Sequence, residues 1–297
     1  MYLFSCIMFA LLGSVLCRSR MFPFRSKFVK KSSLPISACF GKASFTGLDP
    51  LADNILWKSY NFDLGSRTIE VAEAKDVDVV IDYTITHKLP EPYGIQVWDG
   101  AYLLSRILQR YLEVAPVDHT SRLRKLQVVD LGCGNGLASL FCAAHGIPVK
   151  ALDFNPLTLQ LLRMGHAKLF NSCVDPSSVG KVECMLFNMA DESQRLPTCD
   201  LLLMSDVIYS KELGKLAAKR VAEAVNVHNS TVLLTDPGRS TVAVFLEELR
   251  ARLGVQSSSR FGKIEFTKVN ESLYGVKGQY LCLNDWLHIA KLSSNSI

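Results

Sequence analysis

Between Leu126 and Leu253 the chain alternates short apolar runs with longer amphipathic segments. The apolar runs predict β-strands at Leu126–Leu131, Val149–Leu152, Val182–Phe187, Leu201–Met204 and Thr231–Thr235. Between and after them, apolar residues recur at helical spacing in residues 137–145, 155–170, 211–225 and 242–253. Strands that alternate with helices of this length predict an α/β fold, a doubly wound and mostly parallel sheet with helices on both faces.

The flanking segments predict smaller additions to this sheet. Two strand-like runs at the end, Lys263–Val269 and Tyr280–Lys291, have no helix between them and predict an antiparallel hairpin at one edge of a seven-stranded sheet. Ahead of the alternating region, Arg67–Ala72 and Val77–Thr86 alternate like strands and predict a small N-terminal β extension. Gln96–Leu112 has helical spacing, and we expect Trp98 in its first turn.

Residues 1–48 differ from the rest in charge. They contain seven basic residues and no acidic one, so the formal charge of +5 becomes −2 from Asp49 onward. The apolar run Tyr2–Cys17 is shorter than the roughly 20 residues that span a membrane, and the Ser-rich basic stretch after it resembles a transit peptide. We therefore divide the chain into a targeting leader at 1–48, cleaved or disordered, a β extension at 49–95 and a catalytic domain at 96–297.

This division carries expectations about location and partners. The leader predicts a plastid-type organelle or the mitochondrion, with no stable membrane insertion once it is removed; a cytoplasmic chain with a disordered tail or a misassigned start is the alternative. The slightly acidic remainder has no Lys/Arg stripe, so we expect no nucleic-acid partner, and we expect a monomer. Nine cysteines and six histidines lack paired spacing, which predicts buried thiols and no metal site.

Candidate chemistry is concentrated at Val128–Gly136, which reads V-V-D-L-G-C-G-N-G. Glycines let the backbone turn sharply and approach a ligand, and this loop follows a strand at the sheet edge where open α/β folds bind ligands. Asp153 ends the next strand, where a carboxylate can accept hydrogen bonds from ribose hydroxyls. The spacing is G-x-G-x-G rather than the G-x-G-x-x-G of dinucleotide folds, so a dehydrogenase is the weaker interpretation.

With Asp130 before it, this loop resembles motif I of the class I methyltransferases. The resemblance implies the Rossmann-like fold of that class and S-adenosyl-L-methionine as the cofactor. It also implies a set of cofactor-binding positions: Asp130, Gly132, Cys133, Gly134 and Gly136 around the methionine part, Asp153 at the ribose, and Asn188 and Ser205 beside the adenine. Many relatives carry an aromatic residue where this chain has Asn188.

Two further segments resemble family 16 of these methyltransferases, which are mostly protein-lysine methyltransferases. Gly94–Ala101 contains Trp98, whose flat ring approaches the cofactor in that family. Ser205-Asp206-Val207-Ile208-Tyr209 reproduces the family's D-x-x-Y motif, which implies that Asp206 and Tyr209 are catalytic and lie one turn apart at the target amine. A carboxylate can orient an amine and offset its developing charge, and a phenol can fix the direction of its lone pair.

The resemblance as a whole implies an S-adenosylmethionine-dependent N-methyltransferase that acts on lysine side chains of a protein. Two alternatives stay open at the level of sequence. The same fold serves many small-molecule acceptors, and a relative that binds the cofactor without turnover could act as an assembly factor. The segment Asp236–Arg239, D-P-G-R, resembles one branch of the family.

Overall fold

The computed structural model describes residues 50–62, 68–114, 124–254 and 264–284. The predicted leader at 1–48 lies outside these residues, as does the end of the last predicted strand. In the part of the chain that is described, no helix has both the length and the apolar composition to cross a membrane, and all six cysteines are free.

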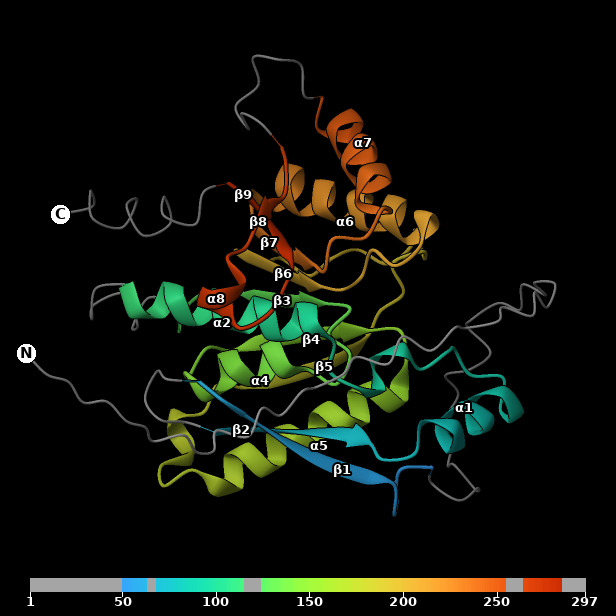
Figure 1. Cartoon of the computed structure of the whole chain (residues 1–297), viewed down its shortest axis with the longest axis vertical. Helices are drawn as coiled ribbons and strands as arrows, with labels where there is room; N and C mark the ends of the chain where they lie inside the picture. The colour runs from blue at the N-terminus through green and yellow to red at the C-terminus, as the bar shows by residue number, and fades with distance from the viewer. Residues whose placement is uncertain (1–49, 63–67, 115–123, 255–263, 285–297) are drawn as a thin grey trace, which may run out of the picture. The chain divides into compact units, whose positions relative to one another are not determined.

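Seven strands form one sheet in the order β5-β4-β3-β6-β7-β9-β8 (Figure 1). The five strands from β5 to β7 are parallel, β9 is antiparallel to β7, and β8 pairs antiparallel with β9 at the other edge. Their bounds are β3 Val128–Leu131, β4 Val149–Asp153, β5 Val182–Leu186, β6 Leu201–Ser205, β7 Thr231–Asp236, β8 Thr267–Lys268 and β9 Gln279–Leu283. The predicted doubly wound sheet with an antiparallel edge hairpin is confirmed.

Helices cover both faces of this sheet (Figure 1). One face packs on α2 (Asp99–Val114), α4 (Leu137–Ala144) and α5 (Pro156–Ser172), and the other on α6 (Lys211–His228) and α7 (Val242–Leu253). Val128 belongs to the first core and Val129 to the second, because successive side chains of a strand point to opposite faces. Three short helical turns complete the fold: η3 (Tyr93–Ile95), η4 (Pro176–Ser178) and α8 (Glu271–Tyr274).

The N-terminal extension differs from its prediction. Its hairpin joins β1 (Ile55–Asn61) to β2 (Thr68–Ala74), so the predicted strand at Arg67–Ala72 is confirmed as β2, and its partner precedes it at residues for which no strand was predicted. Val77–Thr86 is the helix α1, and the prediction of a strand there is wrong. Asp76 caps this helix by accepting hydrogen bonds from two backbone N–H groups, and Val80 and Thr84 are its buried residues, one turn apart. The cap and this single buried stripe outweigh the β-branched composition.

Candidate cofactor and acceptor site

The glycine loop after β3 has the geometry that its sequence predicts. Gly132, Gly134 and Gly136 all have positive φ values, of 72°, 55° and 82°, which residues with a Cβ rarely adopt. The N–H groups of Gly132 and Cys133 donate to the carbonyl of Leu152, at 2.8 and 3.1 Å. The loop is therefore fixed to the end of β4, with the buried Cys133 thiol packed into the core below it.

Two buried carboxylates lie beside this loop. Asp153 accepts hydrogen bonds from the N–H of Gly134 at Oδ2 and from that of Asn155 at Oδ1, both at 2.9 Å. Asp130 accepts one from Ser139 at Oδ2, at 2.6 Å, and its Oδ1 has no hydrogen-bond partner among the described residues. Burial raises the pKa of both acids, that of Asp130 to about 6, with the nearby charge of Asp153 adding to the effect.

The segment from Pro90 to Trp98 contacts the glycine loop, and the N-terminal hairpin holds it in place. The backbones of Gly94 and Gly134 touch, since a Cβ at position 94 would lie 2.5 Å from Gly134 Cα. The fully buried Glu73 of β2 accepts a 2.8 Å hydrogen bond from Val97 N and forms a 2.6 Å ion pair with Lys58 of β1. The N-terminal hairpin thus positions the residue next to Trp98, which directly precedes α2 rather than lying inside it.

Asp206 follows β6 in a left-handed conformation, with φ of 57°. Its Oδ2 accepts a 2.5 Å hydrogen bond from Gly100 N at the start of α2, and its Oδ1 lies 2.6 Å from a guanidinium nitrogen of Arg239. The same nitrogen lies 3.1 Å from the buried Asp236 at the end of β7. Burial raises the pKa of Asp206, and Arg239 opposes this rise.

Tyr209 completes the segment after β6, which is not helical, so the predicted single turn between Asp206 and Tyr209 is wrong. The Tyr209 ring lies 5.0 Å from that of Tyr93, whose hydroxyl donates to Glu91. The carbonyl of Tyr93 accepts a 2.8 Å hydrogen bond from Trp98 Nε1. Burial raises the pKa of Tyr209, and the nearby Tyr93 and the charges of Asp153 and Glu91 add to this effect.

The two residues predicted beside the adenine lie at the ends of β5 and β6. Ser205 is buried at the last position of β6. Asn188 begins a loop in which its own Oδ1 accepts a 2.9 Å hydrogen bond from Ala190 N. The fully buried Arg220 of α6 holds this loop through hydrogen bonds to three backbone carbonyls and an ion pair with Glu223, at 2.6 to 3.1 Å.

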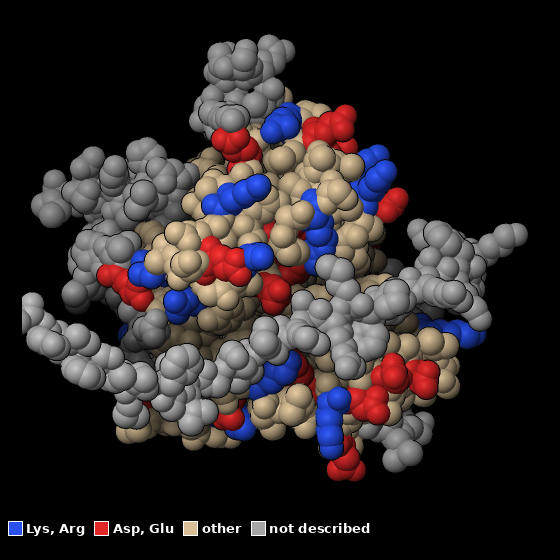
Figure 2. Space-filling model, viewed as in Figure 1, with Lys and Arg blue, Asp and Glu red and all other residues tan. Residues whose placement is uncertain are grey.

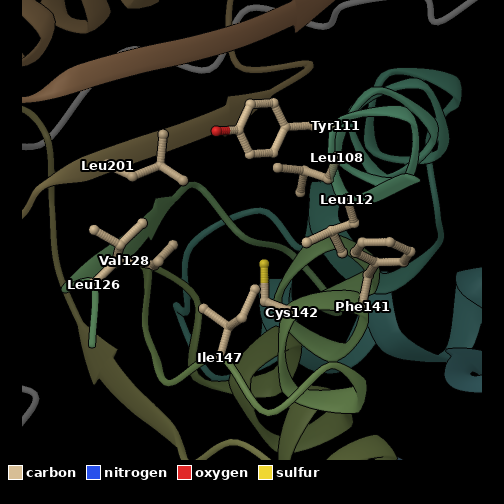
Figure 3. A pocket seen from close by; sticks show the side chains of 9 residues that line it. All are labelled: Leu108, Tyr111, Leu112, Leu126, Val128, Phe141, Cys142, Ile147 and Leu201. Atoms are coloured by element: carbon tan, nitrogen blue, oxygen red, sulfur yellow. The ribbon is translucent and has the colours of Figure 1, made fainter. Parts of the chain in front are cut away.

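Two cavities lie at the opposite, amino-terminal ends of the strands. One, of about 10 Å³ and wholly hydrophobic in its surroundings, lies between α2, α4 and the first residues of β3 and β6 (Figure 3). The other, of about 300 Å³, is lined by Lys125, Lys150, Lys181 and Glu183 among others. Neither contacts the glycine loop, so neither belongs to this site.

The structure therefore brings the predicted residues together at the carboxyl ends of β3, β4, β6 and β7, with Asn188 after β5. Analysis of the sequence missed Glu73, Gly100 and the pair Glu91 and Tyr93. Glu91 and Tyr93 directly precede the Gly94–Ala101 segment and could have been included with it. Nothing local marks Glu73, because its partner Val97 is 24 residues away.

The residues present fit an S-adenosyl nucleoside. Gly132 and Gly134 are partly exposed, Gly132 beside the Val207 side chain and Gly134 beside Gly94, and Asp153 presents a buried carboxylate at the end of the adjacent strand. The unpartnered Asp130 Oδ1 is an acceptor that a cationic group beside the loop would satisfy. In the described part of the chain no group of acidic, His and Cys side chains is arranged to hold a metal ion.

Strand order, glycine loop and the acid after β4 are together those of a class I methyltransferase domain. The sequence profile of the lysine methyltransferase family matches residues 81–251, more than half of the chain, and the chain belongs to this family. The match includes the Trp98 segment, the loop and Asp206 to Tyr209.

Individual relatives are similar over shorter stretches. The electron transfer flavoprotein beta subunit lysine methyltransferase of Danio rerio is 29% identical over 152 residues, which are 51% of this chain and 52% of the relative. That of Xenopus laevis is 26% identical over 151 residues, 50% of this chain and 54% of the relative. The chain thus spans about half the length of these curated relatives.

Solved structures with a similar fold are more distant in sequence. The Thermus thermophilus 16S rRNA N2 G1207 methyltransferase has a TM-score of 0.45 and 16% identity, over 77% of this chain and 50% of that one. The magnesium protoporphyrin IX methyltransferase of Synechocystis has a TM-score of 0.42 and 16% identity, over 71% of this chain and 100% of that one.

Proposed function

We propose that this chain is an S-adenosylmethionine-dependent protein-lysine N-methyltransferase. The observation that carries the proposal is the position of Tyr209, which follows Asp206 after β6 and whose ring lies 5.0 Å from that of Tyr93, the residue that donates a hydrogen bond to the exposed acid Glu91. Membership of the lysine methyltransferase family supports it, because the matched segment contains every residue to which we give a role. A methyl donor held by the glycine loop and an acceptor amine at Tyr209 would meet at one end of the sheet.

Cofactor binding falls to the glycine loop and its neighbours. When bound, the cofactor would supply a sulfonium methyl group for in-line attack by a neutral amine, with S-adenosylhomocysteine as the leaving group. Gly132, Cys133, Gly134 and Gly136 would hold its methionine part, and Asp130 would offer its unpartnered oxygen to the ammonium group. Asp153 would accept hydrogen bonds from the ribose, Asn188 and Ser205 would flank the base, and the half-exposed Trp98 ring would approach the cofactor.

The acceptor side depends on Tyr209 and Asp206. The Tyr209 hydroxyl makes no hydrogen bond to another described residue, so it is available to accept one from the incoming amine and fix its lone-pair direction. The Asp206 carboxylate adds a negative charge that offsets the charge gained by the nitrogen. Since an ammonium has no lone pair, activity requires the lysine to lose a proton before transfer.

We propose the β subunit of electron transfer flavoprotein as the protein substrate, because both relatives above carry this target in their names. The purified chain, incubated with this subunit and labelled S-adenosylmethionine, should transfer label to lysine, located by peptide mass spectrometry. Asp153→Ala should lose both calorimetric binding of S-adenosylhomocysteine and transfer. Tyr209→Phe should keep binding and lose most transfer, whereas Tyr83→Phe, at a partly exposed tyrosine of α1, should keep both.

Absence of any S-adenosylhomocysteine binding by the wild type would refute the proposal outright. Binding without transfer to any protein in a cell extract would instead favour a non-catalytic role. Lys and Arg are interspersed with Asp and Glu on the face drawn in Figure 2, which supports a protein rather than a nucleic acid as partner.

We also propose that the chain acts as a monomer inside an organelle, a plastid-type compartment or the mitochondrion. The acid-free, basic composition of residues 1–48 supports this location. Fusing residues 1–48 to a fluorescent protein should direct it to one of these organelles, and a diffuse cytoplasmic signal would contradict the proposal. Light scattering on the purified chain should give the mass of one chain.

A further inference from the structure

The family motif assigns the substrate amine to Asp206, yet Asp206 and the buried Asp153 both already have partners. In Asp206, Oδ2 accepts a hydrogen bond from Gly100 N at 2.5 Å, and Oδ1 lies 2.6 Å from Arg239 in an ion pair without hydrogen-bond geometry. Both oxygens of Asp153 accept hydrogen bonds from backbone N–H groups. Each oxygen of these two acids therefore already has a donor or a cation beside it, which an incoming ammonium group would have to share.

Glu91 is the acid near Tyr209 that remains available. Its side chain is exposed, it forms no ion pair with a described basic residue, and one of its oxygens accepts a hydrogen bond from the Tyr93 hydroxyl. The Tyr93 ring lies 5.0 Å from the Tyr209 ring at an angle of 51°. One carboxylate and two aromatic rings, each 39% exposed, thus adjoin one another beside the predicted methyl-transfer position.

This set suits an alkylammonium group. A carboxylate oxygen forms charge-assisted hydrogen bonds with an ammonium, and the faces of tyrosine rings attract a cation. The nearby Arg239 would repel such a group if its charge were free, but Asp206 and Asp236 neutralise it at 2.6 and 3.1 Å. The local balance of charge therefore favours a cation at Glu91.

We propose that Glu91, Tyr93 and Tyr209 form the site that receives the substrate's lysine ammonium, and that Asp206 is a positioning residue that fixes α2 and Arg239 in place. This inference rests on the proposed protein-lysine methylation and names the group that selects its substrate. Trp98 Nε1 donates to the carbonyl of Tyr93, which couples the receiving site to the residue that covers the cofactor.

The alternative is that Glu91 only stabilises its own segment by accepting the hydrogen bond from Tyr93. The two roles differ in what Tyr93→Phe does. If Glu91 has only this structural role, Tyr93→Phe and Glu91→Gln should affect lysine binding equally. If Glu91 receives the ammonium, Tyr93→Phe keeps the ring and the carboxylate and should retain lysine binding, whereas Glu91→Gln should lose it.

Binding can be tested without turnover. Nα-acetyl-lysine methylamide is added at millimolar concentrations to the full chain with ¹³C-labelled tyrosine rings and S-adenosylhomocysteine bound, and Nα-acetyl-norleucine methylamide, which lacks the charge, serves as the control ligand. The Tyr93 and Tyr209 ring signals, assigned from the two Tyr→Phe variants, should shift with the lysine probe and not with norleucine. Glu91→Gln should abolish the shifts, and Glu247→Gln, at an exposed glutamate of α7 without an ion pair in the described residues, should retain them.

Kinetics separate this inference from the proposed function. If the wild type methylates the protein substrate, Glu91→Gln should raise its KM about tenfold, the factor that corresponds to one lost charge-assisted interaction, and leave S-adenosylhomocysteine affinity unchanged. Wild-type turnover with an unchanged KM in Glu91→Gln would overturn this inference and leave the proposed function standing. No wild-type turnover would overturn the proposed function, and equal shifts with both probes would overturn the receiving site in either case.

Discussion

The backbone N–H of Gly100 donates a 2.5 Å hydrogen bond to Oδ2 of Asp206, across 106 residues of sequence. The carbonyl of Gly100 accepts another, of 2.8 Å, from the Thr235 hydroxyl of β7. One glycine at the start of α2 thereby links the ends of β6 and β7. Trp98 precedes this glycine and Asp206 follows β6, so the contact joins the cofactor side of the site to the acceptor side.

Gly100→Ala should break this link. The added Cβ would lie 2.3 Å from Asp206 Oδ2, so the carboxylate or the helix start must move. We expect a loss of about 1–3 kcal/mol in the free energy of unfolding, measured with urea, together with a loss of methyl transfer. Gly214→Ala in α6 is the control, since its Cβ would meet its nearest neighbour at 3.5 Å, and it should be neutral or stabilising by up to about 1 kcal/mol.

Asp130→Asn should change how stability depends on pH. Burial raises the pKa of Asp130 to about 6, above the roughly 3.9 of an unfolded aspartate. Between these values the folded state binds more protons than the unfolded state, so the stability of the wild type falls as pH rises through this range. The variant lacks this fall and should be more stable than the wild type by about 1–3 kcal/mol above pH 6, and about equally stable near pH 4.

Urea unfolding at several pH values measures this difference. Asp53→Asn, at an exposed carboxylate in the turn before β1, should show the same dependence of stability on pH as the wild type. If the stability of Asp130→Asn depended on pH in the same way as that of the wild type, the wild-type carboxylate would be charged and hydrogen-bonded in the folded state. That result would contradict its unpartnered Oδ1.

Glu73→Ala tests whether the hairpin supports the site. It leaves Val97 N–H without its acceptor and Lys58 without its partner, so we expect about 1–3 kcal/mol less stability. S-adenosylhomocysteine should also bind more weakly by calorimetry, because Trp98 follows Val97. Glu70→Ala, on the same strand, removes a partly exposed 3.0 Å ion pair with Lys168 and should cost about 0–1 kcal/mol without a change in affinity.

Arg220→Met should loosen the loop that begins at Asn188. The guanidinium satisfies three backbone carbonyls of this loop and pairs with the largely buried Glu223, so its loss should cost about 3–5 kcal/mol of stability. If the loop flanks the adenine, affinity for S-adenosylhomocysteine should fall as well. Lys219→Met removes the neighbouring exposed pair with Glu192 and should leave both measurements unchanged.

The strands and helices of the sheet domain could be predicted from sequence because their patterns are local. Each central strand is a short apolar run, and each helix has an apolar stripe at the helical period, so both elements can be recognised without their partners. The glycine loop and Asp153 were predictable for the same reason, since φ values above zero and a place at a strand end are properties of short segments. The assignments of the site residues to cofactor and acceptor stay predictions.

The tertiary structure determines the features that depend on contacts between residues far apart in the sequence. Val77–Thr86 reads as a strand by composition, but Asp76 and the core that receives Val80 and Thr84 make it a helix. The motif containing Asp206 is visible in sequence, whereas its engagement by Gly100 and Arg239 is not, because these contacts join three elements far apart in the chain. Local periodicity indicates which face of an element is buried. Only the folded structure determines which charged groups find a partner, as Asp206 does, and which, like Glu91, have no ion pair with a described residue.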